Sequence, residues 1–266
     1  RRPPRSTLDR SSAASDVYKR QALLAAIGWC GQGRVTPADL AVTRADAGEW
    51  SRDVSHLCNL LSMGRLRFSF GTMSSGKSTL ALQIHHNLAA TGTGLLCSMH
   101  DRAGAHVSSA LGISTPAVEV HPELDFHALA VSHQSGHGAL DYLVCDEAQF
   151  YTDLQVEQLA QVVDELGADV YAFGLLTDFR GKLFPGSARM LEVADERLEL
   201  QVQARCWCSK PATHNARLHD GAQGYDGDVV LIDDGSAAQV TYELRCRNHW
   251  ILGQSGPMAD RFREAG

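Results

Sequence analysis

The feature that most constrains this chain is an eight-residue loop that runs from Gly71 to Ser78. It fits the phosphate-binding pattern G-x-x-x-x-G-K-[ST] in full, with an expected strand before it and an expected helix after it. Its glycines allow a backbone geometry that places N–H groups around phosphate oxygens at the start of the helix. A Gly/Ser turn that matches by chance is the alternative, and the flanking elements weaken it. The residues expected to hold a nucleotide are Gly71, Thr72, Met73, Ser74, Ser75, Gly76, Lys77 and Ser78.

Four side chains in two segments have chemical roles that follow from this loop. Lys77 is expected to reach the β- and γ-phosphates, and the Ser78 hydroxyl to ligate Mg²⁺. An apolar strand at 142–145 ends in two adjacent acids, Asp146 and Glu147, which in a parallel sheet lie at the ligand-binding edge. We expect Asp146 to hold the Mg²⁺ shell and Glu147 to accept a proton from an attacking oxygen. A solvated acidic pair that caps the next helix is the alternative.

Short apolar segments alternate with segments of helical period from Met63 onward. The pattern predicts strands at 65–70, 95–99, 142–145 and 169–174, and helices at 77–90, 125–133 and 153–166. Strands that alternate with helices indicate a mainly parallel sheet covered on both faces. The expected fold class is therefore α/β, of the P-loop NTPase type, with a small zinc-binding module after it.

The N-terminal part of the chain differs in composition from the rest. Residues 1–62 hold nine Lys and Arg against six Asp and Glu, whereas residues 63–266 hold 15 against 25. We interpret 1–62 as a non-native extension, with Met63 as the natural start. The alternative is a genuine disordered extension with one helix near 36–45. The predicted organisation continues with a kinase-type domain at 63–196, a zinc-ribbon module at 197–254 and a tail at 255–266.

Three cysteines and a histidine form two close pairs in the last part of the chain. They are Cys206-x-Cys208 and Cys246-x-x-His249, and three thiolates with one imidazole match a closed, structural Zn²⁺ site. One accidental pair beside buried thiols is the alternative. The full chain has seven cysteines, an odd number in a chain too long for a disulfide scaffold, so the spacing indicates metal ligation in a reducing compartment.

Composition and charge argue against several classes of protein. No apolar run has the length needed to cross a bilayer, and the short run at 22–30 is a poor match to a signal peptide. The net charge of −7 disfavours a basic groove for duplex DNA. We therefore expect a cytoplasmic protein with neither a nucleic-acid partner nor a membrane partner.

These motifs, and their order along the chain, closely resemble those of the thymidine kinases shared by bacteria and the animal cytosol. The resemblance rests on the phosphate loop, on Asp146–Phe150, on 174–187 and on the Cys/His pairs, and it extends from Met63 to about Trp250. It implies transfer of the γ-phosphoryl group of ATP to the 5′-hydroxyl of thymidine, with Mg²⁺. It also implies a zinc ribbon whose long lasso covers the nucleoside, a homotetramer, and inhibition by dTTP in the substrate site.

The resemblance also implies roles for individual residues. It makes Glu147 the general base and extends the ATP-binding residues through Asp146 and Glu147 to Ala148 and Gln149. The implied substrate-binding residues are Phe150, Leu175, Phe179, Phe184, Tyr242, Asp101 and Arg102. Core packing is the alternative for the phenylalanines, and Arg180 either steers the triphosphate or is simply solvated.

Two segments depart from the family pattern. His100 stands where the family often has an acid, which weakens the argument for giving Asp101 and Arg102 the family's substrate-binding role. The segment 231–241 is longer than its counterpart in the family. Two other functions stay open. One is a P-loop ATPase motor in which Glu147 activates water, and the other is a zinc-ribbon module for nucleic acid, which the acidity of 63–266 disfavours.

Overall fold

The computed structural model describes residues 64–99, 106–200, 204–228, 240–254 and 256. The predicted extension at 1–62, the tail beyond residue 256, the long segment at 231–239 and the residues His100, Asp101 and Arg102 lie outside the described residues.

A six-stranded sheet forms the centre of the fold, in the order β5-β2-β6-β7-β1-β8, and every neighbouring pair in it is parallel. The fold class is thus as predicted. Because the strands run in one direction, the segments that follow β6, β7 and β1 leave the sheet side by side. The strands are β1 (Leu66–Gly71), β2 (Gly94–Ser98), β5 (Val118–Glu119), β6 (Tyr142–Asp146), β7 (Asp169–Leu175) and β8 (Glu196–Glu199).

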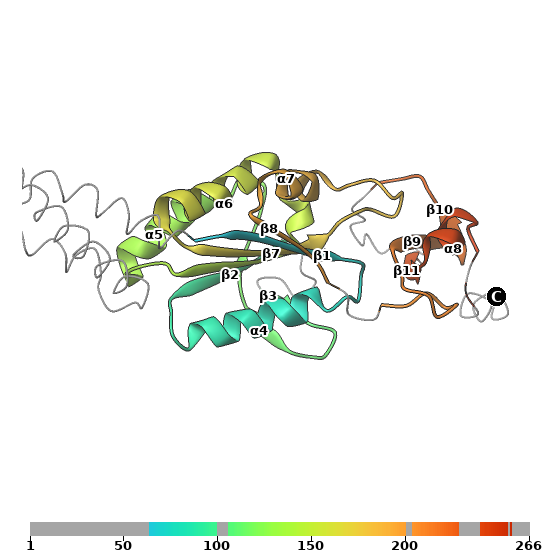
Figure 1. Cartoon of the computed structure of the whole chain (residues 1–266), viewed down its shortest axis with the longest axis horizontal. Helices are drawn as coiled ribbons and strands as arrows, with labels where there is room; N and C mark the ends of the chain where they lie inside the picture. The colour runs from blue at the N-terminus through green and yellow to red at the C-terminus, as the bar shows by residue number, and fades with distance from the viewer. Residues whose placement is uncertain (1–63, 100–105, 201–203, 229–239, 255, 257–266) are drawn as a thin grey trace, which may run out of the picture. The chain divides into compact units, whose positions relative to one another are not determined.

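Helices cover both faces of this sheet (Figure 1). Helix α4 (Lys77–Ala89) packs on one face, and α5 (Phe126–His137), α6 (Asp153–Leu166) and α7 (Pro185–Val193) lie on the other. The strand β6 is buried along its whole length, as expected for a central strand with both faces covered.

Helix α6 shows why the sequence predicts its bounds correctly. The Thr152 side chain accepts from the backbone N–H of Gln155 while the Gln155 side chain accepts from the Thr152 N–H, which is a complete capping box. Gly167 ends the helix in the left-handed conformation that glycine adopts without strain. Between these ends, Leu159, Val162 and other apolar side chains are buried at helical spacing.

The remaining elements are short. Strands β3 (His106–Ser108) and β4 (Ser114–Pro116) form a hairpin, and a 3₁₀ turn, η2 (Ala148–Phe150), follows β6. A second, antiparallel sheet contains β9 (His214–His219), β10 (Ala222–Gly224) and β11 (Val240–Arg245), and helix α8 (Arg247–Ile251) follows it.

The sequence did not predict α7 and β8. Every residue of β8 is exposed and its sequence, Glu-Arg-Leu-Glu, has no apolar alternation, so only its pairing with β1 makes it a strand. Since β8 belongs to the large sheet, that sheet extends past the predicted boundary at residue 196.

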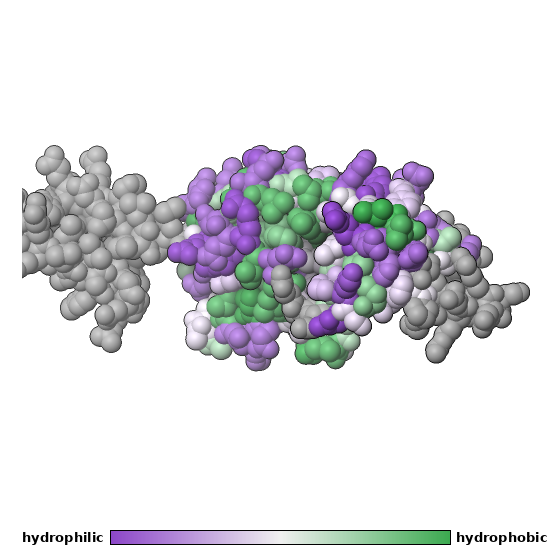
Figure 2. All heavy atoms as spheres, turned by 45° about the vertical axis from the view of Figure 1, so that its right-hand side comes forward, coloured by the Kyte–Doolittle hydropathy of each residue, from purple (hydrophilic) through white to green (hydrophobic). Residues whose placement is uncertain are grey.

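The surface of the described part is mixed. Large exposed apolar side chains occur on several elements, among them Leu111, Leu154, Leu198 and Ile251, and the face in Figure 2 shows apolar patches separated by polar ones. Among the described residues, no helix combines the length and the apolar character needed to cross a membrane.

One glycine tests how tightly α7 packs against η2. A Cβ on Gly186 would lie 2.6 Å from the carbonyl oxygen of Tyr151 and 2.7 Å from that of Ala148. We predict that Gly186→Ala lowers the free energy of unfolding by about 1–3 kcal/mol, because the clash is with backbone atoms that cannot rotate away. Urea denaturation measures the change.

Gly136 provides the matched control. It also lies in a helix, but a Cβ there would meet nothing within 4 Å. Gly136→Ala should leave stability unchanged or raise it by up to about 1 kcal/mol, from helix propensity alone. Equal stabilities for the two variants would show that the close approach of α7 to η2 is not a constraint.

Candidate active site

The phosphate loop connects β1 to α4 in a conformation that favours glycine at one position. Gly76 precedes α4 with φ 79°, in the left-handed region, and Ser74 is also left-handed at φ 58°. A Cβ on Gly71 would lie 2.6 Å from the Ser75 hydroxyl oxygen, so the strand end approaches the loop closely. The sequence-predicted loop therefore has the backbone geometry that a phosphate cradle requires.

Lys77 is buried inside this loop. Only 7% of its surface is exposed, and its Nζ donates to the carbonyl oxygen of Thr72 at 2.8 Å. Burial lowers the pKa of Lys77, and the charges of Glu147 and Asp146 partly oppose that shift. A cation held in so little water interacts strongly with an anionic ligand.

Asp146 lies at the end of β6 and meets the loop from the other side. Its carboxylate accepts from the Glu147 backbone N–H at 3.0 Å, and the Ser78 side chain lies near enough to lower its pKa. Burial, followed by the charge of Glu147, raises the pKa of Asp146 to about 6, while Ser78, the Glu147 N–H and Lys77 oppose the rise. A hydroxyl and a carboxylate side by side are ligands that Mg²⁺ prefers, so the pair predicted for Mg²⁺ is brought together.

Glu147 occupies a backbone conformation that is rare for a residue with a Cβ. Its φ is 55° and its ψ 33°, which costs about 1–3 kcal/mol and persists only when the surroundings impose it. Gln149 donates from Nε2 to Glu147 Oε2 at 2.5 Å, and the Tyr151 hydroxyl donates to the Asp146 carbonyl oxygen at 3.3 Å. Gln149 thus holds one oxygen of the Glu147 carboxylate at this strained turn.

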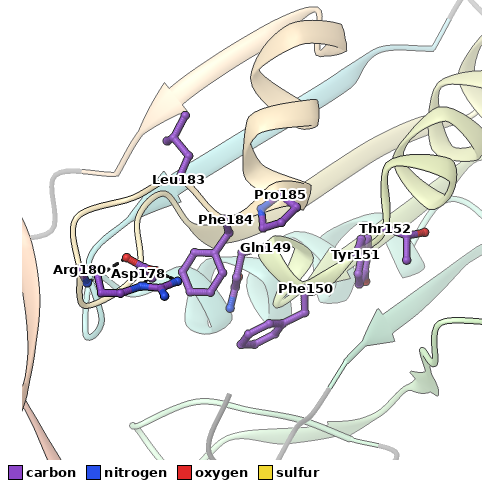
Figure 3. A pocket seen from close by; sticks show the side chains of 9 residues that line it. All are labelled: Gln149, Phe150, Tyr151, Thr152, Asp178, Arg180, Leu183, Phe184 and Pro185. Atoms are coloured by element: carbon purple, nitrogen blue, oxygen red, sulfur yellow. Dashed lines mark hydrogen bonds and ion pairs between the residues drawn. The ribbon is translucent and has the colours of Figure 1, made fainter. Parts of the chain in front are cut away.

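A pocket of about 370 Å³ opens beside this turn. The rings of Phe150 and Phe184 meet edge to face with centroids 5.6 Å apart, and Figure 3 shows them next to Gln149 and the joined pair of Asp178 and Arg180. The volume and the two rings suit a flat aromatic ligand. The lining residues are Gln149, Phe150, Tyr151, Thr152, Asp178, Arg180, Leu183, Phe184 and Pro185.

Asp178 and Arg180 are pocket residues whose roles the sequence leaves open. Asp178 is buried and accepts from the backbone N–H groups of Arg180 and Lys182, while the Arg180 guanidinium donates to it at 2.7 Å. The Arg180 guanidinium is therefore paired with Asp178 rather than simply solvated, and a role toward the triphosphate stays a prediction. The signal in the sequence is the tight Asp-Phe-Arg-Gly turn, which ends in Gly181 at φ 73°.

The structure brings some of the predicted substrate residues to this pocket and leaves others outside it. Phe150 and Phe184 line it, whereas Phe179 is buried with the guanidinium of Arg217 3.6 Å above its ring. Tyr242 lies on β11, 40% exposed, and its hydroxyl accepts from Arg217 Nε at 3.3 Å. Leu175 ends β7, where its backbone N–H donates to Gln149 and its carbonyl oxygen accepts from Ser187. The roles assigned to these three residues stay predictions.

The four predicted metal ligands converge on one point. Their donor atoms all lie within 4.8 Å of one another, with Cys206 Sγ 3.3 Å from His249 Nδ1 and Cys208 Sγ 3.9 Å from Cys246 Sγ. Ligands bound tetrahedrally to one zinc ion lie roughly 3.3–3.8 Å from each other, so the donor set fits this ion. The Trp207 ring stacks on His249 at 4.0 Å, which holds the imidazole plane.

Comparison with known proteins shows the family to which the chain belongs. The family model described as thymidine kinase matches residues 64–250. A thymidine kinase of Cutibacterium acnes is 49% identical over 200 residues, which cover 74% of this chain and 93% of that protein. A thymidine kinase of Streptomyces avermitilis is 52% identical over 70% of this chain and 88% of that protein. One of Rhizobium meliloti is 41% identical over 71% of this chain and 96% of that protein. The phosphate loop, the paired acids and the metal ligands thus belong to a chain that is a member of the thymidine kinase family.

Proposed function

We propose that this protein transfers the γ-phosphoryl group of ATP to the 5′-hydroxyl of thymidine, giving dTMP and ADP. The observation that carries the proposal is the convergence of Lys77, Ser78, Asp146 and Glu147 at the sheet edge that adjoins an aromatic pocket. The names of the relatives support it independently. A buried lysine with paired acids serves any P-loop NTPase, but the aromatic pocket favours a nucleoside as the acceptor.

The chain's own residues would act as follows. The loop amides and Lys77 bind and orient the phosphates, and Ser78 with Asp146 would hold Mg²⁺, which when bound neutralises phosphate charge. Phe150 and Phe184 orient the nucleoside. Glu147 takes the proton from the 5′-hydroxyl as the oxygen–phosphorus bond forms, since the hydroxyl itself is a weak nucleophile.

The zinc site would be structural. A closed set of four protein ligands leaves no position for a substrate, and the ligands precede β9 and follow β11, two strands of a small three-stranded sheet. The ion would stabilise the ribbon without taking part in phosphoryl transfer.

Organisation and regulation extend the same proposal. The division into an extension at 1–62, a kinase domain that includes β8, a zinc-ribbon module after β8 and a tail rests on composition and motifs. A homotetramer, inhibition by dTTP in the substrate site and a cytoplasmic location rest on the family resemblance.

Removal of the base tests the reaction directly. Glu147→Gln keeps the shape of the side chain and removes its basicity, so we predict that kcat falls by about 10²–10⁴-fold, the usual contribution of a general base. The affinity for ATP should hardly change because Lys77 and the loop are intact. Single-turnover phosphorylation of thymidine measures the chemical step, and the exposed Glu123→Gln is the control.

Two results would contradict this proposal. Near-normal single-turnover rates in Glu147→Gln would exclude the base assignment. ATP turnover by the parent protein that does not depend on thymidine would exclude the kinase and favour an ATPase.

Metal analysis tests the ribbon. We predict one zinc ion per chain in protein purified without chelator, and a clear loss of zinc in Cys208→Ser, because three ligands bind the ion less tightly than four. Cys97→Ala, which removes a thiol buried in the large sheet, should keep its zinc. Zinc-free parent protein would show that the four ligands pack together without a metal.

A further inference from the structure

Gln149 is a buried side chain with an unusual pair of contacts. Only 1% of its surface is exposed. Its Oε1 accepts from the backbone N–H of Leu175 at 3.0 Å, and its Nε2 donates to Glu147 Oε2 at 2.5 Å. One amide group therefore joins the end of β7 to the carboxylate that serves as base in the proposed function.

The chemistry of the two partners fixes which way this amide points. A backbone N–H can only donate, so the oxygen of Gln149 must face Leu175. The nitrogen then faces Glu147, whose ionised carboxylate can only accept. Rotating the amide by half a turn would place two acceptors together at Glu147 and two donors at Leu175, so the observed orientation is the only stable one.

The surroundings leave little freedom to this contact. A Cβ on Gly174 would lie 2.9 Å from Gln149 Oε1 and 3.1 Å from its backbone nitrogen, so the absence of a side chain there makes room for the glutamine. On the far side, the Ser187 hydroxyl donates to the carbonyl oxygen of Leu175 at 2.6 Å. Leu175, whose N–H anchors Gln149, is thus itself held by the sheet and by α7.

We propose that Gln149 is a positioning residue that holds the Glu147 carboxylate in line for proton transfer. The proposal rests on the proposed function and adds to it a residue that acts only through Glu147. A glutamate side chain has several rotatable bonds, and Glu147 starts from a strained backbone, so a single fixed donor decides where its oxygens lie. Displacement of a reacting group by about 1 Å can cost about 10²-fold in rate.

A second role for Gln149 is direct recognition of the nucleoside, since it lines the pocket with Phe150 and Phe184. The observed contacts favour positioning, because the Leu175 N–H and the Glu147 carboxylate already engage both ends of the amide. The two roles differ in what they change: positioning affects the chemical step, whereas recognition affects the KM for thymidine.

A double-mutant cycle tests the proposal. Gln149→Met should lower the single-turnover rate about 10–100-fold, with the KM values for thymidine and ATP within about threefold of the parent, as for other partners that orient a reacting group. In a Glu147→Gln background the same change should cost less than about threefold, because no carboxylate remains to be positioned. Gln149→Glu keeps the acceptor for Leu175 but sets a carboxylate against Glu147, and should be at least as slow as Gln149→Met.

Gln158 supplies the matched control. It is also a buried glutamine whose Oε1 accepts from a backbone N–H, that of Phe126 at 3.1 Å, but it lies in α6 and joins that helix to the start of α5. Gln158→Met should lose stability as Gln149→Met does and keep the parent rate. This comparison separates the loss of a buried hydrogen bond from the loss of positioning.

Three results would overturn the proposal. An equal loss of rate from Gln149→Met in both backgrounds would show a merely structural role. A raised KM for thymidine with an unchanged rate would show nucleoside recognition. A Gln149→Glu variant that folds and keeps the parent rate would show that no donor is needed, which also decides the question should Gln149→Met fail to fold. Failure of the proposed function looks different, because Glu147→Gln alone would then keep its rate.

Discussion

The candidate site depends on keeping charged groups almost free of water at one edge of the sheet. Lys77 and Asp146 are both nearly fully buried. Burial favours the neutral form of each group, so it lowers the pKa of the lysine and raises the pKa of the carboxyl group. Their mutual attraction and the Ser78 hydroxyl offset part of this cost. An anionic ligand beside Lys77 and a cation beside Asp146 would offset more of it, so the site favours the pair of charges that nucleotide and metal bring.

Strand order explains how distant segments form this edge. Strands β6, β7 and β1 are neighbours in the sheet. In the sequence, however, more than 70 residues separate Gly71 at the end of β1 from Asp146 at the end of β6, and about a hundred separate Gly71 from Leu175 at the end of β7. Parallel strands place the segments after them at one end. The acids after β6, the pocket loop after β7 and the phosphate loop after β1 therefore meet at one end of the sheet, where β7 lies between β6 and β1.

Local patterns in the sequence are enough to predict part of this structure. The phosphate loop, the acidic pair, α6 and each of the two Cys/His pairs are specified by residues close together in the chain, so their patterns can be recognised there, although the two pairs themselves lie 38 residues apart. The strand β8 and the contact of Gln149 with Leu175 are not of this kind. In the first case an exposed, unpatterned segment becomes a strand by pairing with β1, and in the second the partners lie 26 residues apart.

The conformation of Glu147 shows how far the site depends on packing beyond its motif. Three carbonyl groups that follow Glu147, those of Ala148, Gln149 and Tyr151, lie so near Gly186 that no Cβ fits between them and α7. The helix thus presses on the turn from one side while Gln149 ties its carboxylate to β7 from the other. A left-handed glutamate needs such constraints because its backbone alone would relax. The Asp-Glu pair therefore acquires its geometry from Gly174 and Gly186 as much as from its own sequence, and a chain with the pair but without these glycines would not hold the carboxylate in the same place.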